Sequence, residues 1–228
     1  MIKFYYSLAP NPRKVALFLE EAELPYEAIP VDTRKGEQHL PAFTAINPNA
    51  KVPAIVDGES VVFDSSAILL YLADKTGRFL SRPESRGELL SWLMFTASGI
   101  GPFTGQCVHF HNYAPEKVPY AITRYDFEAR RHWTLIEQRL ATREWMIDDT
   151  YTLLDMAVWG WARTLPFALG DDVWKEFPRV KRFVETIDAR PAAQRALAMK
   201  DLYNFKTGMD AQAWRAMFPH VAQVPEDK

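Results

Sequence analysis

The hydrophobic positions of the first third of the chain alternate between short strand-like runs and one helical face. An aromatic run covers Ile2 to Tyr6, and apolar residues then recur at helical spacing from Val15 to Ala22. A second strand-like run lies near Tyr26 to Val31. This order of elements is typical of a βαβ unit.

Two further apolar runs follow a less regular, helix-like stretch. They are Ala54 to Val56 and Ser60 to Val62, and Asp57-Gly58 between them indicates a hairpin turn, because glycine accepts the positive φ that such turns require. A helix over Ser66 to Lys75 completes the unit. The order βαβ and then ββα predicts a thioredoxin-like α/β domain at 1–79, although other small α/β folds share this order.

Helical periodicity replaces the strand signals in the rest of the chain. A kink is expected within the first long helix at Gly99 to Pro102. A second helix is expected over Pro115 to Leu140, and Thr152 to Asp155 has the pattern of a capping box that opens a third. We therefore predict an all-helical second domain. The predicted linker, all-helical domain and polar C-terminal tail are 80–85, 86–205 and 206–228.

Composition and charge narrow the classes of function. With 228 residues and 48% hydrophobic content, the chain can fill a core. Its formal net charge of -2 and interspersed charges give no broad basic surface, so small ligands are expected as partners, and nucleic acid and membranes are not. No apolar run approaches the ~20 residues of a membrane span, and the N-terminus lacks the apolar core of a secretory signal. A cytoplasmic location is therefore expected.

Cysteine and histidine usage limits the chemistry further. The single cysteine, Cys107, excludes an intramolecular disulfide and a CxxC redox pair, so any redox chemistry must take its thiol from a ligand. Cys107 itself is expected to be a buried small apolar residue. His109 and His111 lie two apart, which points them to different sides of a helix, and no Asp, Glu or Cys set completes a ligand group. No metal site is expected.

Three stretches carry a family resemblance when taken as an ordered set. They read FLEEAELPYEAIPVD, NPNAKVPAIVDGESVVFDSSAILLYLADKTG and GQCVHFHNYAPEKVPYAITRY. The chain resembles the cytosolic glutathione transferases over nearly its whole length, and most closely the bacterial Nu class, which looks like glutathione-dependent disulfide reductases more than conjugating enzymes. The resemblance implies the glutathione transferase fold, glutathione as co-substrate, a disulfide or electrophile as second substrate, and a homodimer.

The resemblance places glutathione contacts in the first domain. Pro53 would be a cis proline that turns the backbone of Val52 toward the cysteinyl backbone of glutathione, like an added strand. Ser65, at a helix start, would hold the γ-glutamyl carboxylate, and Asp64 would face the ammonium group. The alternatives are an ordinary proline at the start of a strand and plain helix N-caps.

Two more residues, Gln38 and Arg124, match glutathione-site positions of the family, and Lys51 lies nearby in the sequence. Gln38 would reach the glycyl end of the ligand, and Lys51 would add positive charge, although a polar loop is more often solvated surface. Arg124 matches an arginine that reaches the glutathione site of the neighbouring subunit, where a guanidinium suits a carboxylate. The alternative for Arg124 is an ion pair with Glu128 at i+4.

The loop before the first helix is where a sulfur contact is expected. A free thiol has a pKa of about 8.5, so the site must supply donors to hold a thiolate at neutral pH. The Nu class has a threonine where this chain has Ala9, which leaves Asn11 as the predicted catalytic residue. With Pro12 at the first helical position, Asn11 would cap the helix with its oxygen and point its NH₂ group at the sulfur. Asn11 as a cap alone, and Ser7 as the sulfur contact, remain alternatives; Tyr5 and Tyr6 are expected within the strand.

These residues favour an enzyme that uses the glutathione thiolate, most of all for disulfide reduction, with weak conjugation to electrophiles. A glutathione-binding regulatory or scaffold protein without turnover is the alternative, to which the departures at Ala9 and Asp64 give weight. A helical interaction module without a ligand is a third. Glutathione binding and turnover distinguish the three.

Overall fold

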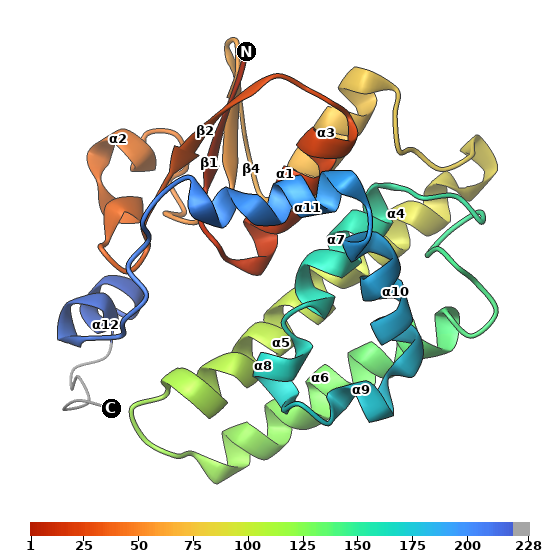
Figure 1. Ribbon diagram of the computed structural model, residues 1–228. Coiled ribbons are helices and arrows are strands. Elements are labelled where there is room, and N and C mark those ends of the chain that lie inside the picture. The colour runs from red at the N-terminus through yellow and green to blue at the C-terminus, as the bar shows by residue number, and fades with distance from the viewer. Residues whose placement is uncertain (221–228) are drawn as a thin grey trace.

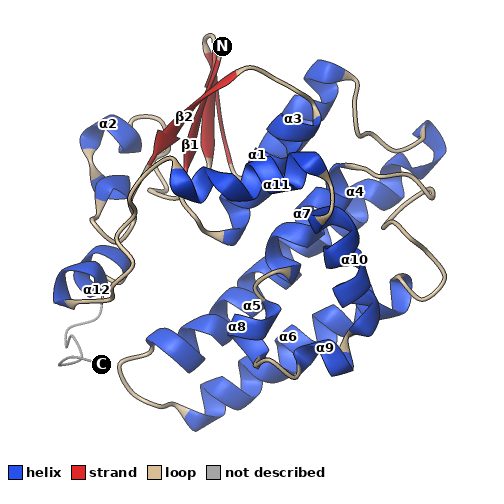
Figure 2. Cartoon of the chain, viewed as in Figure 1, coloured by secondary structure: helices blue, strands red, loops and turns tan. Residues whose placement is uncertain are grey.

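A four-stranded mixed sheet and a bundle of helices make up the protein in the computed structural model, which describes residues 1–220 (Figures 1 and 2). The strand order is β2-β1-β3-β4. β1 (Ile2–Tyr6) runs parallel to β2 (Tyr26–Pro30) and antiparallel to β3 (Ala54–Asp57), which pairs antiparallel with β4 (Ser60–Phe63). The predicted βαβ and ββα order is confirmed, and Tyr5 and Tyr6 lie within β1 as expected.

Alternate side chains of β1 enter two different hydrophobic clusters, as the two-residue period of a strand requires. Phe4 is fully buried in the large cluster that also holds residues of α1 (Pro10–Glu21) and α3 (Ser65–Thr76). Tyr5 packs instead against Phe43 of the short helix α2 (Pro41–Thr44), with 5.8 Å between ring centroids. The sheet is therefore covered on both faces.

The remaining elements are helical. The α-helices are α4 (Arg86–Phe95), α5 (Gly101–Val108), α6 (Pro119–Arg139), α7 (Leu153–Ala162), α8 (Leu165–Leu169), α9 (Val173–Glu176), α10 (Pro178–Asp188), α11 (Pro191–Ala198) and α12 (Ala211–Met217). Short 3-10 turns lie at Glu37–His39, Pro83–Ser85 and Met199–Asp201, and π-helical turns at Thr96–Ile100 and His109–Tyr113. None of the described helices combines the length and apolar character that crossing a membrane requires.

The kink expected at Gly99 to Pro102 is a π-helical turn that joins α4 to α5. A Cβ atom at Gly99 would lie 2.6 Å from the His132 ring, so only glycine allows α6 to approach this closely. The predicted capping box is also confirmed, since Thr152 and Asp155 cap the start of α7 reciprocally.

The two halves share one core. The large cluster runs from Phe4 and Phe18 of the first half to Trp133 and Trp159 of the second, all at most 1% exposed. Figure 1 shows α7 and α11 beside α1, and this junction is where the site described below lies.

The segment predicted as a polar tail contains a helix and returns to the first half of the chain. The Lys206 N–H donates to Asp32 Oδ2 at 2.7 Å, and the Gln38 amide donates to the Ala216 carbonyl in α12 at 3.0 Å. Residues 221–228 of the predicted tail lie outside the described part of the chain. The domain boundaries predicted above stay predictions.

Candidate functional site

Two cavities flank the N-terminal end of α1, and Trp161 of α7 lines both. The smaller, of about 230 Å³, lies between the first turns of α1 and α3 and is called the cap cavity here. The larger, of about 500 Å³, is called the arginine cavity. The cap cavity is lined by Asn11, Lys14, Asp64, Ser65, Ser66, Thr96, Ala97, Gly101, Pro102 and Trp161.

Asn11 does not cap α1. The helix begins at Pro10 with Ala9 as its N-cap residue, and Ala9 makes no side-chain capping bond, so the prediction that Asn11 is the cap and Pro12 the first helical residue is wrong. Proline is tolerated throughout the first turn because its missing N–H has no helical partner there, so Pro10 can open the helix as well as Pro12.

The Asn11 side chain is oriented by a residue from the other half of the chain. The Trp161 indole Nε1–H donates to Asn11 Oδ1 at 2.9 Å. An indole N–H can only donate, so the amide must turn its oxygen toward Trp161. The NH₂ group of Asn11 donates to no atom of residues 1–220 and is available to a ligand in the cap cavity.

Gly160 makes this contact possible. A Cβ atom there would lie 2.5 Å from Lys14 Cγ and 2.8 Å from the Pro10 carbonyl oxygen. Only glycine lets α7 pack so closely on the first turns of α1, and this packing brings the next residue, Trp161, within reach of Asn11.

The start of α3 supplies the second group of polar atoms. Asp64 is the N-cap, and its Oδ1 accepts from the Ser66 N–H at 2.8 Å and the Ala67 N–H at 3.2 Å. Ser65 is buried, and its hydroxyl accepts a hydrogen bond from Lys14 Nζ at 3.3 Å. The Val52–Pro53 peptide bond just before β3 is cis, as the resemblance implies.

Lys14 places a titratable cation beneath Ser65. The side chain is 1% exposed, and burial lowers the pKa of Lys14 to about 7, against the opposing effect of the Asp64 carboxylate. The ammonium form therefore adds positive potential to the helix N-terminus at and below neutral pH, where an anionic group in the cap cavity would benefit from it.

Replacing Lys14 with methionine is expected to change how stability depends on pH. In the unfolded chain a lysine keeps its ordinary pKa of 10.5. Between pH 7 and pH 10.5 the unfolded state therefore binds more protons than the native state, and native stability rises with pH. The Lys14→Met variant lacks this rise. The unfolding free energy of the variant minus that of the native chain should therefore fall by roughly 2 kcal/mol between pH 6 and pH 9. Urea unfolding at both pH values measures it, with exposed Lys175→Met as control. The same difference in unfolding free energy at both pH values would contradict a buried, titrating Lys14.

The other predicted contacts lie outside both cavities. Gln38 is buried with its NH₂ group bonded to Ala216 in α12, and its Oε1 accepts no hydrogen bond from residues 1–220. Lys51 is exposed. Arg124 of α6 pairs with Glu128 Oε1 at 2.8 Å, which is the i,i+4 alternative. Within one chain, the structure thus brings together Asn11, Asp64 and Ser65 only.

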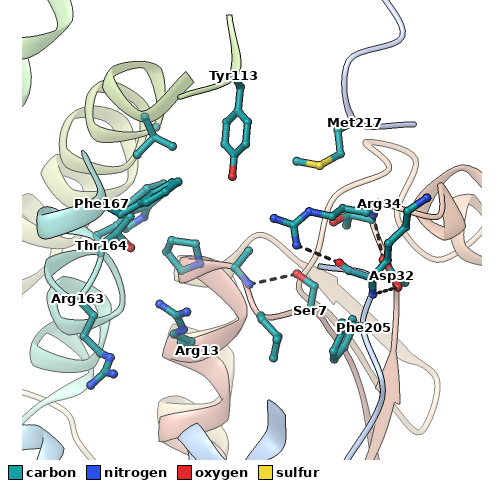
Figure 3. Close-up of a pocket in the computed structure, with 18 residues that line it drawn as sticks. Ser7, Arg13, Asp32, Arg34, Tyr113, Arg163, Thr164, Phe167, Phe205 and Met217 are labelled. Carbon is teal, nitrogen blue, oxygen red and sulfur yellow. Dashed lines mark hydrogen bonds between the residues drawn. The ribbon is translucent and has the colours of Figure 1, made fainter. Parts of the chain in front are cut away.

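The arginine cavity carries an excess of positive charge (Figure 3). Its charged lining residues are Arg13, Arg34, Arg163, Lys206 and a single acid, Asp32. Arg163 pairs with Asp188, and Arg34 donates to the Lys206 carbonyl at 3.1 Å. This lining suits an anionic ligand.

Arg13 is the cation of this cavity that has no partner within the described chain. Its guanidinium is half-buried and makes no hydrogen bond or ion pair with residues 1–220. Burial lowers the pKa of Arg13, and Arg163 nearby lowers it further. A carboxylate of a bound ligand would relieve both effects. Ser7 also lines this cavity, with its Oγ accepting from the Ala9 N–H at 3.3 Å, and stays the alternative sulfur contact.

Sequence reasoning missed Arg13, Lys14 and the hydrogen bond from Trp161 to Asn11. Arg13 and Lys14 follow Asn11 closely in the sequence, and this proximity was a signal that could have been used. Trp161 lies 150 residues from its partner, and no local pattern indicates that contact.

Cys107 is fully buried, as expected. Burial raises the pKa of its thiol, and the hydrogen bond to Asp126 raises it further, so the thiol stays protonated. The search for an Asp, Glu or Cys set around the histidines overlooked one group, because Cys107, His111 and Asp126 lie together in the structure.

Comparisons with known proteins agree over both halves of the chain. The family model for the glutathione S-transferase N-terminal domain matches residues 9–75, and that for the C-terminal domain matches residues 108–198. The disulfide-bond oxidoreductase YfcG of Escherichia coli is 43% identical over 210 residues, which cover 89% of this chain and 97% of YfcG.

Solved structures show the same likeness. A glutathione transferase from Burkholderia graminis, with two glutathione molecules bound per subunit, is 37% identical with a TM-score of 0.83, covering 87% of this chain and 88% of its own. A glutathione transferase from Pseudomonas putida, with one glutathione disulfide bound per subunit, is 35% identical with a TM-score of 0.82, covering 87% of this chain and 91% of its own.

Proposed function

The chain belongs to the glutathione S-transferase family, and from this premise we propose that it is a glutathione-dependent disulfide oxidoreductase that also conjugates electrophiles weakly. The observation that carries the proposal is the orientation of the Asn11 amide. Trp161 holds the amide oxygen, and the amide NH₂ group stays free between the start of α3 and the cationic arginine cavity. The likeness to a named disulfide-bond oxidoreductase favours disulfide exchange over conjugation.

The cap cavity is the proposed place of the reacting glutathione. Its γ-glutamyl carboxylate would bind the hydroxyl and the backbone N–H of Ser65 at the start of α3, and the Lys14 ammonium would add positive charge beside them. The exposed Asp64 carboxylate would face the ammonium group, and the Val52 backbone would pair with the cysteinyl residue. Asn11 would then donate to the sulfur.

The arginine cavity is the proposed place of the disulfide substrate. A glutathionyl group carries more carboxylates than ammonium groups, so its net charge suits the cationic lining, and Arg13 is free to pair with one carboxylate. The relatives with two glutathione molecules or one glutathione disulfide per subunit support a site of this size.

The reaction proceeds by two thiol exchanges. The glutathione thiolate attacks one sulfur of the substrate disulfide, which forms a mixed disulfide and expels the other sulfur as a thiolate that takes a proton. A second glutathione thiolate attacks the glutathione sulfur of the mixed disulfide, giving glutathione disulfide and the second reduced thiol. Asn11 stabilises the sulfur anion, and the two cavities align the reacting sulfurs.

The remaining predicted contacts require rearrangement or a second subunit. Gln38 can reach the glycyl carboxylate only if its NH₂ group leaves Ala216. We also propose a Nu-class homodimer in which Arg124 reaches the partner's glutathione. Exposed apolar residues next to it on α6, Tyr120 at 81% and Phe127 at 59%, support an interface there.

Reduction of 2-hydroxyethyl disulfide with glutathione tests the proposal, with conjugation of 1-chloro-2,4-dinitrobenzene and glutathione binding measured alongside. The expected result is disulfide reduction well above background and weak conjugation. Glutathione binding without turnover in either assay would contradict the proposal and support a regulatory or scaffold protein. The absence of glutathione binding would support a helical interaction module without a ligand.

A further inference from the structure

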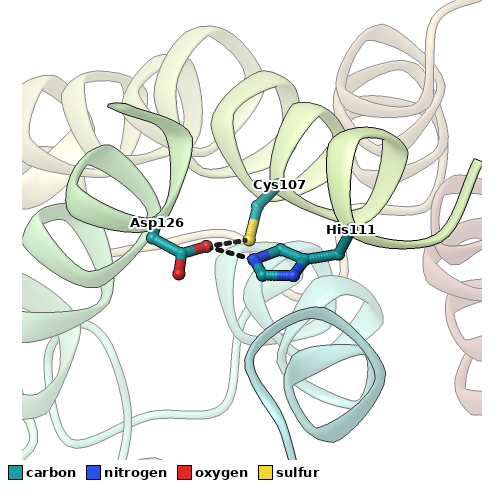
Figure 4. Close-up of side chains that lie close together, drawn as sticks. All are labelled: Cys107, His111 and Asp126. Carbon is teal, nitrogen blue, oxygen red and sulfur yellow. Dashed lines mark hydrogen bonds and ion pairs between the residues drawn. The ribbon is translucent and has the colours of Figure 1, made fainter. Parts of the chain in front are cut away.

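A cysteine, a histidine and an aspartate meet where the end of α5 and the turn after it face α6 (Figure 4). Asp126 Oδ1 lies 3.1 Å from Cys107 Sγ and 2.6 Å from His111 Nε2. The three side-chain atoms that could bind a metal all lie within 4.8 Å of one another. None of these residues lines the cap cavity or the arginine cavity.

Helix geometry explains why they meet. Cys107, near the end of α5, and His111, in the π-helical turn that continues it, are four residues apart and so share one face, one turn apart. Asp126 comes from α6, which packs antiparallel against α5 after the loop at 114–118. Cys107 and His111, four residues apart, and the facing Asp126 carboxylate form a group of three possible metal ligands. Because Asp126 lies on another helix, the sequence alone does not show this group.

The donor set has the composition of a zinc site. Zinc is bound by thiolate at about 2.3 Å and by imidazole or carboxylate at about 2.0–2.2 Å, which sets tetrahedral ligand atoms about 3 to 4 Å apart. The 3.1 Å between Cys107 Sγ and Asp126 Oδ1 lies within that range, and the 2.6 Å between His111 Nε2 and Asp126 Oδ1 is slightly shorter than it. The thiolate disfavours magnesium and calcium, which prefer oxygen ligands.

A fourth position is open. His111 and Asp126 are about a third exposed, and both line a separate cavity of about 310 Å³ against the end of α8. A water molecule or a small anion can enter from this cavity, while Cys107 closes the buried side. The arrangement of three protein ligands and one exchangeable position is the usual one for an accessible zinc ion.

We propose that Cys107, His111 and Asp126 bind one divalent zinc-like ion. On binding, Sγ bonds to the metal and the thiol proton leaves to solvent, while the imidazole carries its proton on Nδ1 and ligates through Nε2. The Asp126 carboxylate exchanges its two hydrogen bonds for a metal bond. The ion would tie the end of α5 to α6 and stabilise this helix pair.

Titration of the intact protein with Zn²⁺, without glutathione and with a phosphine reductant, tests the proposal by calorimetry and thermal unfolding. Substitution by Co²⁺ gives a direct signature, because a thiolate ligand adds a charge-transfer band in the near ultraviolet. The expected result is one ion per chain, a raised Tm with Zn²⁺, and that band with Co²⁺. Failure of the native chain to show the band would overturn the proposal.

Variants separate this group from adventitious binding. Cys107→Ser should abolish the cobalt band, and Cys107→Ser and Asp126→Asn should each weaken Zn²⁺ at least about 100-fold. His109→Ala is the matched control, because His109 lies two residues from His111 and contacts Phe110 and Phe218 instead. The Zn²⁺ affinity of this variant should equal that of the native chain. Equal Zn²⁺ affinity in Cys107→Ser and the native chain would overturn the proposal.

A measurement on the native chain covers the case in which Cys107→Ser does not fold. Cys107 is the single thiol, so alkylation reports on it alone. Zn²⁺ should slow its alkylation at least about tenfold, since a bound thiolate must first dissociate. An alkylation rate that Zn²⁺ leaves unchanged would overturn the proposal.

Discussion

Replacing Asn11 with alanine is expected to lower kcat for glutathione-dependent disulfide reduction by roughly 100-fold, the effect of removing one preorganised donor to a developing anion. Asn11 is held in one orientation by the 2.9 Å bond from Trp161, so its NH₂ group needs no reorganisation when the sulfur becomes charged. The glutathione KM should change much less, because Ser65 and the start of α3 carry most of the proposed binding. Steady-state kinetics with 2-hydroxyethyl disulfide measures both quantities.

Trp161→Phe isolates the orienting bond. The phenyl ring keeps most of the packing but removes the indole N–H, which allows the Asn11 amide to flip and turn its oxygen toward the sulfur. We expect a loss of about 5- to 10-fold in kcat, the worth of one neutral hydrogen bond. Trp92→Phe, on α4 and against Arg139, is the matched control and should be unaffected. An Asn11→Ala rate equal to that of the native chain would move the sulfur contact to Ser7 or to backbone donors.

Replacing Asp155 with alanine is expected to lower the free energy of unfolding by about 3 kcal/mol, because it leaves buried donors without an acceptor. Asp155 is fully buried, and its carboxylate accepts from the N–H groups of Met146 and Thr152, each at 2.7 Å. Burial raises the pKa of Asp155 to about 7, and these hydrogen bonds oppose that rise. The group joins the loop before α7 to the start of α7, whose other end carries Trp161.

Thermal unfolding is the measurement for Asp155→Ala, with a Tm about 6 to 12 °C lower expected for a chain of this size. Asp172→Ala serves as the control, since the Asp172 side chain is 87% exposed in a surface ion pair and should change stability by less than about 0.5 kcal/mol. A Tm of Asp155→Ala equal to that of the control would show that the loop and α7 do not depend on the capping box.

Asn11 was selected as a candidate by a capping argument that the structure contradicts. Sequence reasoning selected it because it lies between two prolines at a helix start, and it expected the amide oxygen to cap the helix. The oxygen instead accepts from a tryptophan of the other half of the chain, and the helix begins two residues earlier than predicted, at Pro10. The Asn11 NH₂ group is free in both cases, because the amide oxygen is occupied either by a helix N–H, as predicted, or by the Trp161 indole N–H, as observed.

Local patterns predicted the order of strands and helices in the first domain and the capping box at Thr152 and Asp155, and the family resemblance predicted the cis bond at Pro53. Each depends on neighbours within a few residues or on a contiguous motif, so the linear chain contains it. Only the tertiary structure decided the rest, namely the Trp161 bond to Asn11, the excess of positive charge in the arginine cavity, the Gln38 contact with α12 and the meeting of Cys107, His111 and Asp126. These contacts join residues far apart in sequence, and their geometry arises from how helices pack, which periodicity does not encode.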